Sequence, residues 1–387
     1  MKILVIANAN SEWVYNFISL FCGSEITVSL FSCYRIEQSY YNRYDQFGIH
    51  IIRSPEYVQN YLDRYKHSFM SKVFFLSSLI RTVRGFSRTC KWDIINIQYV
   101  DPHLLRVFAL FPALTRKLVL SYWGSDLMRE NSAVLGSITE IVSNSLGSTF
   151  DNGDLVRIHE NLYPDYQKRS IIMLPLPILD DIERLDSEKQ SEYICIDGQI
   201  IKRDKILICI GYNGRRQQQH DLVLDQLKKM NEKIKSKISL LFPFTYSVDK
   251  YDTYIDDLKV QISESGIESY IFERLLSNED LARLRIATDV FINAQTTDAF
   301  SGSVCEALYA GGILVNAKWL HYEELDKYNL EYIEYSEFKD IPPIVERIIK
   351  GFDRNHKDLQ NRVSIRKLRS IENCRQQWIS YFSRLIE

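Results

Sequence analysis

Two acidic residues, Asp298 and Glu306, are separated by seven residues in a segment that follows an apolar run. The turn between them is made of small residues, Ser301, Gly302 and Ser303. Backbone amides at such a turn, at the start of a helix, can hold phosphate oxygens. One turn into that helix, Glu306 could accept hydrogen bonds from ribose hydroxyls, and Asp298 on the preceding loop could meet a sugar. The segment therefore predicts a site for a nucleotide diphosphate sugar.

A second loop with similar chemistry follows the apolar run that ends at Ile210. Its chemistry-bearing residues are Gly211, Gly214, Arg215, Arg216 and His220. Glycines at a strand-to-helix turn let backbone amides approach a ligand closely. Arginines add positive charge where a diphosphate would bind. We expect Arg215, with Arg216 and His220, to stabilise the charge that develops on a leaving diphosphate.

Polar and aromatic residues also follow apolar runs in the first half of the chain, at Asn10, Tyr99, His103, Trp123 and Asp126. The carboxyl ends of strands line the binding crevice of an open α/β sheet. We therefore expect the first four residues to contact an acceptor, although His103 could equally be a satisfied loop histidine. Asp126 is a candidate for positioning the acceptor or for handling a proton. The first loop carries no G-x-G-x-x-G motif, which argues against a dinucleotide site.

Residues 64 to 91 form a basic segment that contains no acidic residue. Its cations are Arg64, Lys66, Lys72, Arg81, Arg84, Arg88 and Lys91. They alternate with large apolar residues, which include Phe74 and Phe75. A basic amphipathic helix of this kind can lie on an anionic membrane surface. The alternative is a helix with its apolar face in the core and its cations in water.

The elements that must position these residues are indicated by short apolar runs that alternate with segments of helical periodicity. The runs lie at 3–7, 27–31, 49–52, 94–98, 118–122 and 170–174, and then at 205–211, 239–244, 270–272, 289–293 and 312–316. Continuous apolar strands separated by helices are typical of parallel sheets with both faces covered. We predict an α/β protein with two doubly wound, Rossmann-like domains that face a cleft.

The predicted domains are residues 1–178, which would bind an acceptor, and residues 200–363, which would bind the nucleotide sugar. Prolines at 175 and 177, followed by a charged stretch, predict a linker near 178–200. From 364 to 387 the sequence is again helical, with an apolar stripe that includes Trp378 and Phe382. We expect this C-terminal helix to cross back and pack toward the first domain.

Length and composition exclude several classes of protein. A chain of 387 residues, 45% of them apolar, suits two globular domains and not a disordered or fibrous chain. A net charge of −2 gives the chain no electrostatic reason to coat nucleic acid. The seven scattered cysteines show no metal-site spacing. No apolar stretch is long enough to span a membrane, and the N-terminus does not resemble a signal peptide, so we expect a cytoplasmic protein, peripheral at most to the inner face of the cell membrane.

The segment from Asp298 to Glu306 resembles the acidic-x7-acidic signature of GT-B glycosyltransferases, especially family 4. The resemblance implies that the first acid lies by the donor sugar and that the second contacts the ribose. Asp298 stands where the family usually has Glu. Arg215 matches a diphosphate-binding Arg, whereas His220 stands at the position of a Lys. The segment from Trp123 to Asp126 is similar to the family's His-Gly-x-Asp, with Trp in place of His.

The resemblance implies transfer of a sugar from a nucleotide diphosphate sugar to a hydroxyl of a glycan or lipid-linked acceptor. It also implies retention of anomeric configuration, no metal ion or other cofactor, and a place in bacterial surface polysaccharide biosynthesis. Two other readings stay open. One is a nucleotide-sugar 2-epimerase, which shares the two-domain plan. The other is a catalytically silent GT-B-like subunit, which the departures at Trp123, His220 and Asp298 keep open.

Overall fold

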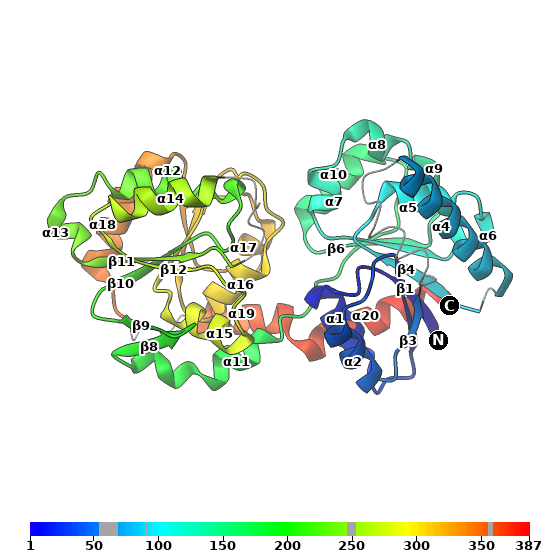
Figure 1. The fold of residues 1–387 in the computed structure, drawn as a ribbon, viewed down its shortest axis with the longest axis horizontal. Coiled ribbons are helices and arrows are strands. Elements are labelled where there is room, and N and C mark those ends of the chain that lie inside the picture. Colours follow the sequence, from blue (N-terminus) through cyan, green and yellow to red (C-terminus); the bar gives the residue numbers. More distant parts are fainter. Residues whose placement is uncertain (54–68, 90, 246–252, 355–358) are drawn as a thin grey trace. The chain divides into compact units, whose positions relative to one another are not determined.

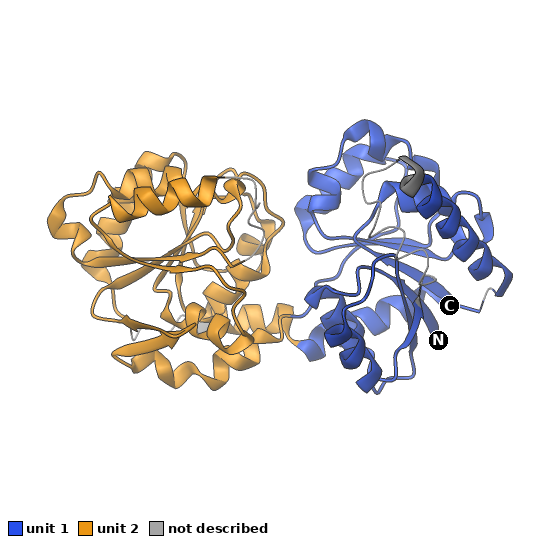
Figure 2. Cartoon of the chain, in the orientation of Figure 1, with its two compact units in different colours: residues 1–175, 371–387 blue, residues 176–370 orange. Residues whose placement is uncertain are grey.

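The computed structural model describes residues 1–53, 69–89, 91–245, 253–354 and 359–387. Contacts divide the chain into two compact units (Figure 2), of which unit 1 is Met1–Pro175 with Ile371–Glu387 and unit 2 is Leu176–Ser370. Each unit contains a parallel sheet with helices on both faces (Figure 1). The prediction of two doubly wound, Rossmann-like domains is confirmed.

The sheet of unit 1 has the strand order β3-β2-β1-β4-β5-β6-β7, and all of its pairs are parallel. The strands are β1 (Lys2–Ile6), β2 (Thr27–Ser32), β3 (His50–Arg53), β4 (Ile94–Gln98), β5 (Leu118–Tyr122), β6 (Gly147–Phe150) and β7 (Arg169–Ile171). The central strands β4 and β5 are fully buried and mostly apolar, as expected for strands covered on both faces, and the polar Asn96, Gln98 and Ser121 are buried with them. The order reverses between β1 and β4, so the loops after these two strands flank the switch point of the sheet.

Ten described helices cover this sheet, and most are short. They are α1 (Glu12–Ser19), α2 (Gln38–Gln46), α4 (Phe69–Thr89), α5 (Pro102–Phe108), α6 (Pro112–Thr115), α7 (Ser125–Met128), α8 (Ser132–Gly136), α9 (Thr139–Asn144), α10 (Gly153–Leu162) and α20 (Ile371–Ile386). The ends of several helices are set by local chemistry. Asp101 caps α5 by accepting from the amide of His103, with Pro102 in the first turn, and Asn152 caps α10.

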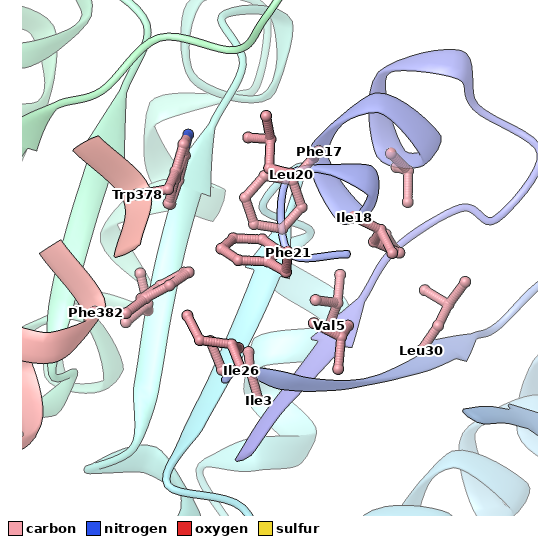
Figure 3. Close-up of a cluster of buried hydrophobic side chains, with 14 of the residues drawn as sticks. Ile3, Val5, Phe17, Ile18, Leu20, Phe21, Ile26, Leu30, Trp378 and Phe382 are labelled. Atoms are coloured by element: carbon pink, nitrogen blue, oxygen red, sulfur yellow. The ribbon is translucent and has the colours of Figure 1, made fainter. Parts of the chain in front are cut away.

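The C-terminal helix α20 belongs to unit 1, which confirms the predicted crossing back. Figure 3 shows Trp378 and Phe382 of α20 pointing toward Phe17 of α1 and toward Phe21, which lies just after the end of α1. The Trp378 ring meets Phe17 edge-on at a centroid distance of 4.8 Å, and its indole N–H donates to the carbonyl of Met173 at 3.2 Å. We expected one C-terminal helical segment from 364 to 387 beside the first domain. Only α20 lies in unit 1, because residues 364–369 belong to α19 (Leu359–Arg369) of unit 2.

The sheet of unit 2 has the order β12-β11-β10-β13-β14-β15 and is also parallel. Its strands are β10 (Ile206–Ile210), β11 (Ile238–Pro243), β12 (Glu268–Phe272), β13 (Val290–Asn293), β14 (Ile313–Ala317) and β15 (Ile333–Tyr335). Besides α19, its helices are α11 (Ile178–Arg184), α12 (His220–Leu227), α13 (Glu232–Lys235), α14 (Tyr254–Ser263), α15 (Asn278–Ala287), α16 (Gly302–Tyr309), α17 (Glu323–Lys327) and α18 (Ile341–Gly351). The switch point here lies between β10 and β13.

The segment at 178–200 is folded into unit 2, whereas we expected a linker. It forms α11 and then an antiparallel hairpin of β8 (Tyr193–Ile196) and β9 (Gln199–Lys202). The turn residues Asp197 and Gly198 both have positive φ, at 48° and 75°, as the favoured two-residue hairpin turn requires. Lys189 is buried and donates to the carbonyl of Ala310 at 2.9 Å, which fastens the segment to α16.

Helix α4 contains most of the basic segment, of which residues 64–68 and 90 lie outside the described residues. Leu79, Val83 and Phe86 are buried on one face. Val73 and Leu76, nearer the start of the helix, are exposed. No helix in the described part of the chain has both the length and the apolar character needed to cross a bilayer.

Candidate functional site

Two loops meet at the switch point of unit 2, one after β10 and one after β13. Gly211 begins the first loop with a φ of +65°, and its amide donates to the carbonyl of Ile292 at 3.2 Å. Further along, the amide of Thr296 donates to the carbonyl of Gln217 at 2.9 Å, and the side chain of Gln219 donates to the carbonyl of Ala294 at 2.6 Å. The loops that carry most of the predicted donor residues are therefore bound to each other.

Glycine is required at 211 by both space and conformation. A Cβ there would lie 2.6 Å from the side-chain oxygen of Gln218 and 2.9 Å from Nε2 of His220. The left-handed φ would strain any other residue as well. The groups that crowd Gly211 are side chains of the same loop and of the start of α12, and the predicted approach to a ligand stays a prediction.

His220 lies beneath this loop and cannot supply the positive charge that we expected of it. The ring is fully buried, its Nδ1 lies 3.2 Å from the Tyr254 hydroxyl, and burial lowers its pKa to about 3. The imidazole is therefore neutral at physiological pH. Its position makes it a support for the loop, in a place where a charged side chain would be costly.

Arg215 and its neighbours are the cations at this loop. The Arg215 side chain is exposed, and its backbone amide donates to the side chain of Asn213 at 3.0 Å. Gly214 is buried beside it. The guanidinium of Arg216 lies over the Tyr254 ring, 4.8 Å from its centroid. Arg215 thus remains the residue best placed to reach an anion from this loop.

Asp298 is held by a set of hydrogen bonds within the second loop. It accepts from the Tyr322 hydroxyl at 2.6 Å, from the amide of Ala299 at 2.9 Å and, more weakly, from the Tyr212 hydroxyl at 3.4 Å. Burial raises the pKa of this carboxyl, and hydrogen bonds from Tyr322, Ala299 and Ser301 partly offset the rise. Both oxygens accept from groups of the chain, which fix the acid in place beside the switch point.

The turn from Ser301 to Ser303 opens α16, as predicted, with Ser301 as its N-cap and Gly302 as its first residue. The first-turn amides of this helix are directed away from its body, where an anion would be stabilised. Phe300 precedes the turn in a left-handed conformation with φ of 54°. A strained residue held next to a helix start is a common feature of ligand-binding loops.

Glu306 is paired inside the protein with Arg285, a residue of α15. Nε of Arg285 lies 2.8 Å from the Glu306 carboxylate, and its Nη2 donates to the hydroxyl of Ser303 at 2.9 Å. Both side chains of the ion pair are buried, Glu306 being 7% exposed. One oxygen of Glu306 is thus occupied by Arg285, which the sequence analysis did not anticipate.

In unit 1, Asp126 joins the loops after β4 and β5. Its carboxylate accepts from the amide of Val100 at 2.8 Å, from Trp123 at 3.0 Å and from Gly124 at 2.9 Å. Burial raises its pKa to about 6, against the opposing effect of these amides. Both oxygens therefore hold the backbone of these two loops.

The predicted acceptor residues lie on the loops after β1, β4 and β5. Tyr99 is exposed, with φ of 66°, and its ring meets that of Trp123 edge-on at 6.1 Å. The side chain of Asn10 bridges the carbonyl of Arg35 and the amide of Glu37, at 2.8 and 2.9 Å. Asn10 therefore orders a neighbouring loop. His103 is exposed on α5, with Nδ1 3.4 Å from Arg106.

Among the described residues, no group of three or more His, Cys, Asp or Glu side chains is arranged to hold a metal ion.

No family model matches the chain, and no curated protein matches it in sequence. Solved structures do match it. HepE of Anabaena, in complex with UDP and glucose, gives a TM-score of 0.69 at 13% identity, over 99% of this chain and 100% of that one. A glycosyltransferase of Rickettsia africae gives 0.69 at 11% identity, over 100% and 98%. The lipopolysaccharide outer core galactosyltransferase WaaB, in its apo form, gives 0.65 at 12% identity, over 99% and 100%. The chain therefore has the GT-B fold of these glycosyltransferases.

Proposed function

We propose that the protein is a glycosyltransferase that moves a sugar from a UDP-sugar to a hydroxyl group of an acceptor. The observation that carries the proposal is the pair of loops at the switch point of unit 2. They bring the Gly211 turn, the exposed Arg215, the N-terminus of α16 and Asp298 to one edge of the sheet. UDP is the nucleotide present in the HepE structure, which favours uridine over other bases.

Each group at this edge suits one part of the donor. The amides of Gly302 and Ser303 and the side chain of Arg215 would bind the diphosphate, while the amide of Ser301 donates to Asp298. Glu306, held by Arg285, would present its second oxygen to the ribose hydroxyls. Asp298, fixed by Tyr322, would bind the transferred sugar.

The chemical step follows from these roles. The acceptor oxygen forms a bond to the anomeric carbon, the bond from that carbon to the diphosphate oxygen breaks, and UDP leaves with the electron pair. The acceptor proton passes to the leaving phosphate or to solvent. Arg215 and the α16 amides would stabilise the charge that develops on the diphosphate. We propose retention of configuration and transfer without a metal ion, in line with the family 4 resemblance.

A UDP-release assay with the full chain tests the proposal. The protein is incubated with a panel of UDP-sugars, with and without simple alkyl glycosides as acceptors. We expect UDP release with at least one donor, loss of release in Asp298→Asn, and normal release in Asp225→Asn, an exposed acid on α12. Interconversion of the UDP-sugar without release would instead indicate an epimerase. Binding without turnover of any donor would indicate a silent subunit.

We also propose that the acceptor is a glycan or a lipid-linked glycan of a bacterial surface polysaccharide, met at the cytoplasmic face of a membrane. Helix α4 supports this part of the proposal. Val73 and Leu76 are exposed near its start, and Arg81, Arg84 and Arg88 are exposed further along. Phe74 and Phe75 are half-buried and not fully enclosed. An exposed face with an apolar end and a basic end suits contact with anionic lipid.

A further inference from the structure

Three exposed or partly exposed aromatic side chains follow three strands of the unit 1 sheet, all at the carboxyl edge. Tyr34 follows β2, Tyr99 follows β4, and Trp123 follows β5. Tyr34 is 60% exposed and Tyr99 is 45% exposed. The edge flanks the switch point between β1 and β4, where open α/β sheets bind ligands.

Two of these rings are in contact, and Tyr34 follows a strand of the same sheet edge. Tyr99 and Trp123 are perpendicular, 6.1 Å apart, and the indole N–H of Trp123 donates to the side chain of Gln98 at 2.8 Å. Partial burial raises the pKa of Tyr34, and the charges of Cys33, Asp101 and Tyr99 raise it further. The Ser32 hydroxyl bonds to both the amide and the carbonyl of Tyr34 and so orders its backbone.

The conformation of Tyr99 is unusual for a bulky residue. Its φ of 66° is left-handed, and it is maintained by bonds on both sides. The amide of Tyr99 donates to the carbonyl of Ser121 at 3.1 Å, and that of the next residue donates to Asp126 at 2.8 Å. A strained backbone that is held by its surroundings and exposes its ring is a sign of function.

We propose that Tyr34, Tyr99 and Trp123 form a platform on which a pyranose ring of the acceptor stacks. The inference rests on the proposed glycosyltransferase function and adds which surface of unit 1 would bind a sugar of the acceptor. A sugar needs apolar ring faces next to polar groups, and here the Ser125 hydroxyl donates to the Tyr99 hydroxyl at 3.3 Å. A lipid chain would need a continuous apolar surface, of the kind found on α4.

Saturation-transfer NMR with the full chain tests the platform. The probes are methyl β-D-glucopyranoside, methyl β-D-galactopyranoside, cellobiose and lactose, each at millimolar concentration. We expect transfer to the ring C–H protons of at least one probe. Loss of one ring should weaken this binding roughly three- to tenfold. The informative variants are Tyr34→Ala and Tyr99→Asn, since Asn tolerates the left-handed backbone but removes the ring.

Two controls separate stacking from loss of structure. Tyr99→Phe keeps the ring and should bind as the wild type does. Tyr193→Ala removes an equally exposed ring from β8 in unit 2 and should also have no effect. The proposal is overturned if no probe receives saturation from the wild type, or if the combined Tyr34→Ala and Tyr99→Asn variant binds normally. UDP binding measured on the same samples reports on unit 2, so a failed platform and a failed donor site are distinguishable.

Discussion

The carboxyl edges of the two sheets differ in the types of residue that form them. In unit 2, the edge at β10 and β13 consists of glycines, serines and a buried ion pair, and its loops are bonded backbone to backbone. In unit 1, the edge at β4 and β5 consists of aromatic rings supported by one buried carboxylate, Asp126. The same topology thus presents amides and an acid on one unit and rings on the other.

This difference fits two kinds of ligand. A nucleotide diphosphate has fixed charges and hydroxyls, which backbone amides and a fixed carboxylate can match in one geometry. An acceptor sugar offers mainly ring faces, which aromatic side chains can bind at low entropic cost. We therefore expect substitutions in unit 2 to alter UDP binding. Substitutions in unit 1 should alter sugar binding and the pH dependence of stability.

The largest effect is expected from Glu306→Ala. The substitution leaves the buried guanidinium of Arg285 without its carboxylate, which costs about 3–5 kcal/mol of stability. Urea unfolding should show this loss in the transition of unit 2. UDP binding should disappear as well, because the proposed ribose contact is removed.

A double variant separates these two roles of Glu306. Arg285→Met combined with Glu306→Leu replaces the ion pair by apolar side chains and should restore most of the stability. It should still fail to bind UDP. Wild-type affinity for UDP in the double variant would show that Glu306 does not contact the nucleotide.

The next largest effect is on the pH dependence of the stability of unit 1, through Asp126. Burial raises the pKa of Asp126 from an ordinary 3.8 to about 6, so the folded protein binds more protons than the unfolded chain between these values. Stability from this group is therefore present at low pH and is lost as pH rises through about 6, by up to roughly 3 kcal/mol. Asp126→Asn should flatten that part of the pH dependence of urea unfolding. An unchanged slope would contradict this assignment.

A smaller effect is expected from Arg215→Ala. The side chain is exposed, so the unfolding free energy should not change. A charge-assisted bond to the diphosphate is worth about 1.5–3 kcal/mol, so the Kd for UDP should rise roughly 10- to 150-fold. Arg216→Ala is the matched control, since its guanidinium lies against Tyr254, and its effect should be smaller. Equal increases of the Kd for UDP in the two variants would show that Arg215 is not the main diphosphate-binding cation of this loop.

The smallest effect is expected on α4. Arg84→Gln removes one exposed charge and should weaken binding to vesicles rich in anionic phospholipid by about 1 kcal/mol, or roughly fivefold, at low salt. Lys350→Gln, an exposed cation on α18 of unit 2, should leave vesicle binding unchanged. Equal losses in the two variants would mean that attraction comes from overall charge and not from α4.

Most strands could be predicted because their residues form short apolar runs, as in β1 and β10. Strand β6 was missed because it reads Gly147, Ser148, Thr149 and Phe150. Its polar side chains are buried only because they find partners, such as the bond from Thr149 to the Ser121 hydroxyl at 2.8 Å. The hairpin of β8 and β9 was missed although Asp197 and Gly198 are a known turn signal, because charge and proline nearby suggested a linker.

The parts of the site that follow a strand or begin a helix could be predicted from the sequence. The contacts between residues far apart in the sequence could not. The turn before α16 and the loop after β10 follow directly from strand and helix positions. The partners of the acids come from elsewhere: Arg285 lies on α15, and Tyr322 lies beyond β14. No local pattern marks them. The burial of His220 is likewise set by the aromatic rings around it, including Phe244 at 5.2 Å.

The central claim is that the loops at the switch point of unit 2 bind a nucleoside diphosphate. The most direct test is a calorimetric titration of the full chain with UDP, with GDP, dTDP and CMP as comparisons. We expect saturable binding of UDP at one site per chain, weaker or absent binding of the others, and a clear loss in Arg215→Ala. Absence of binding for all four nucleotides would contradict it.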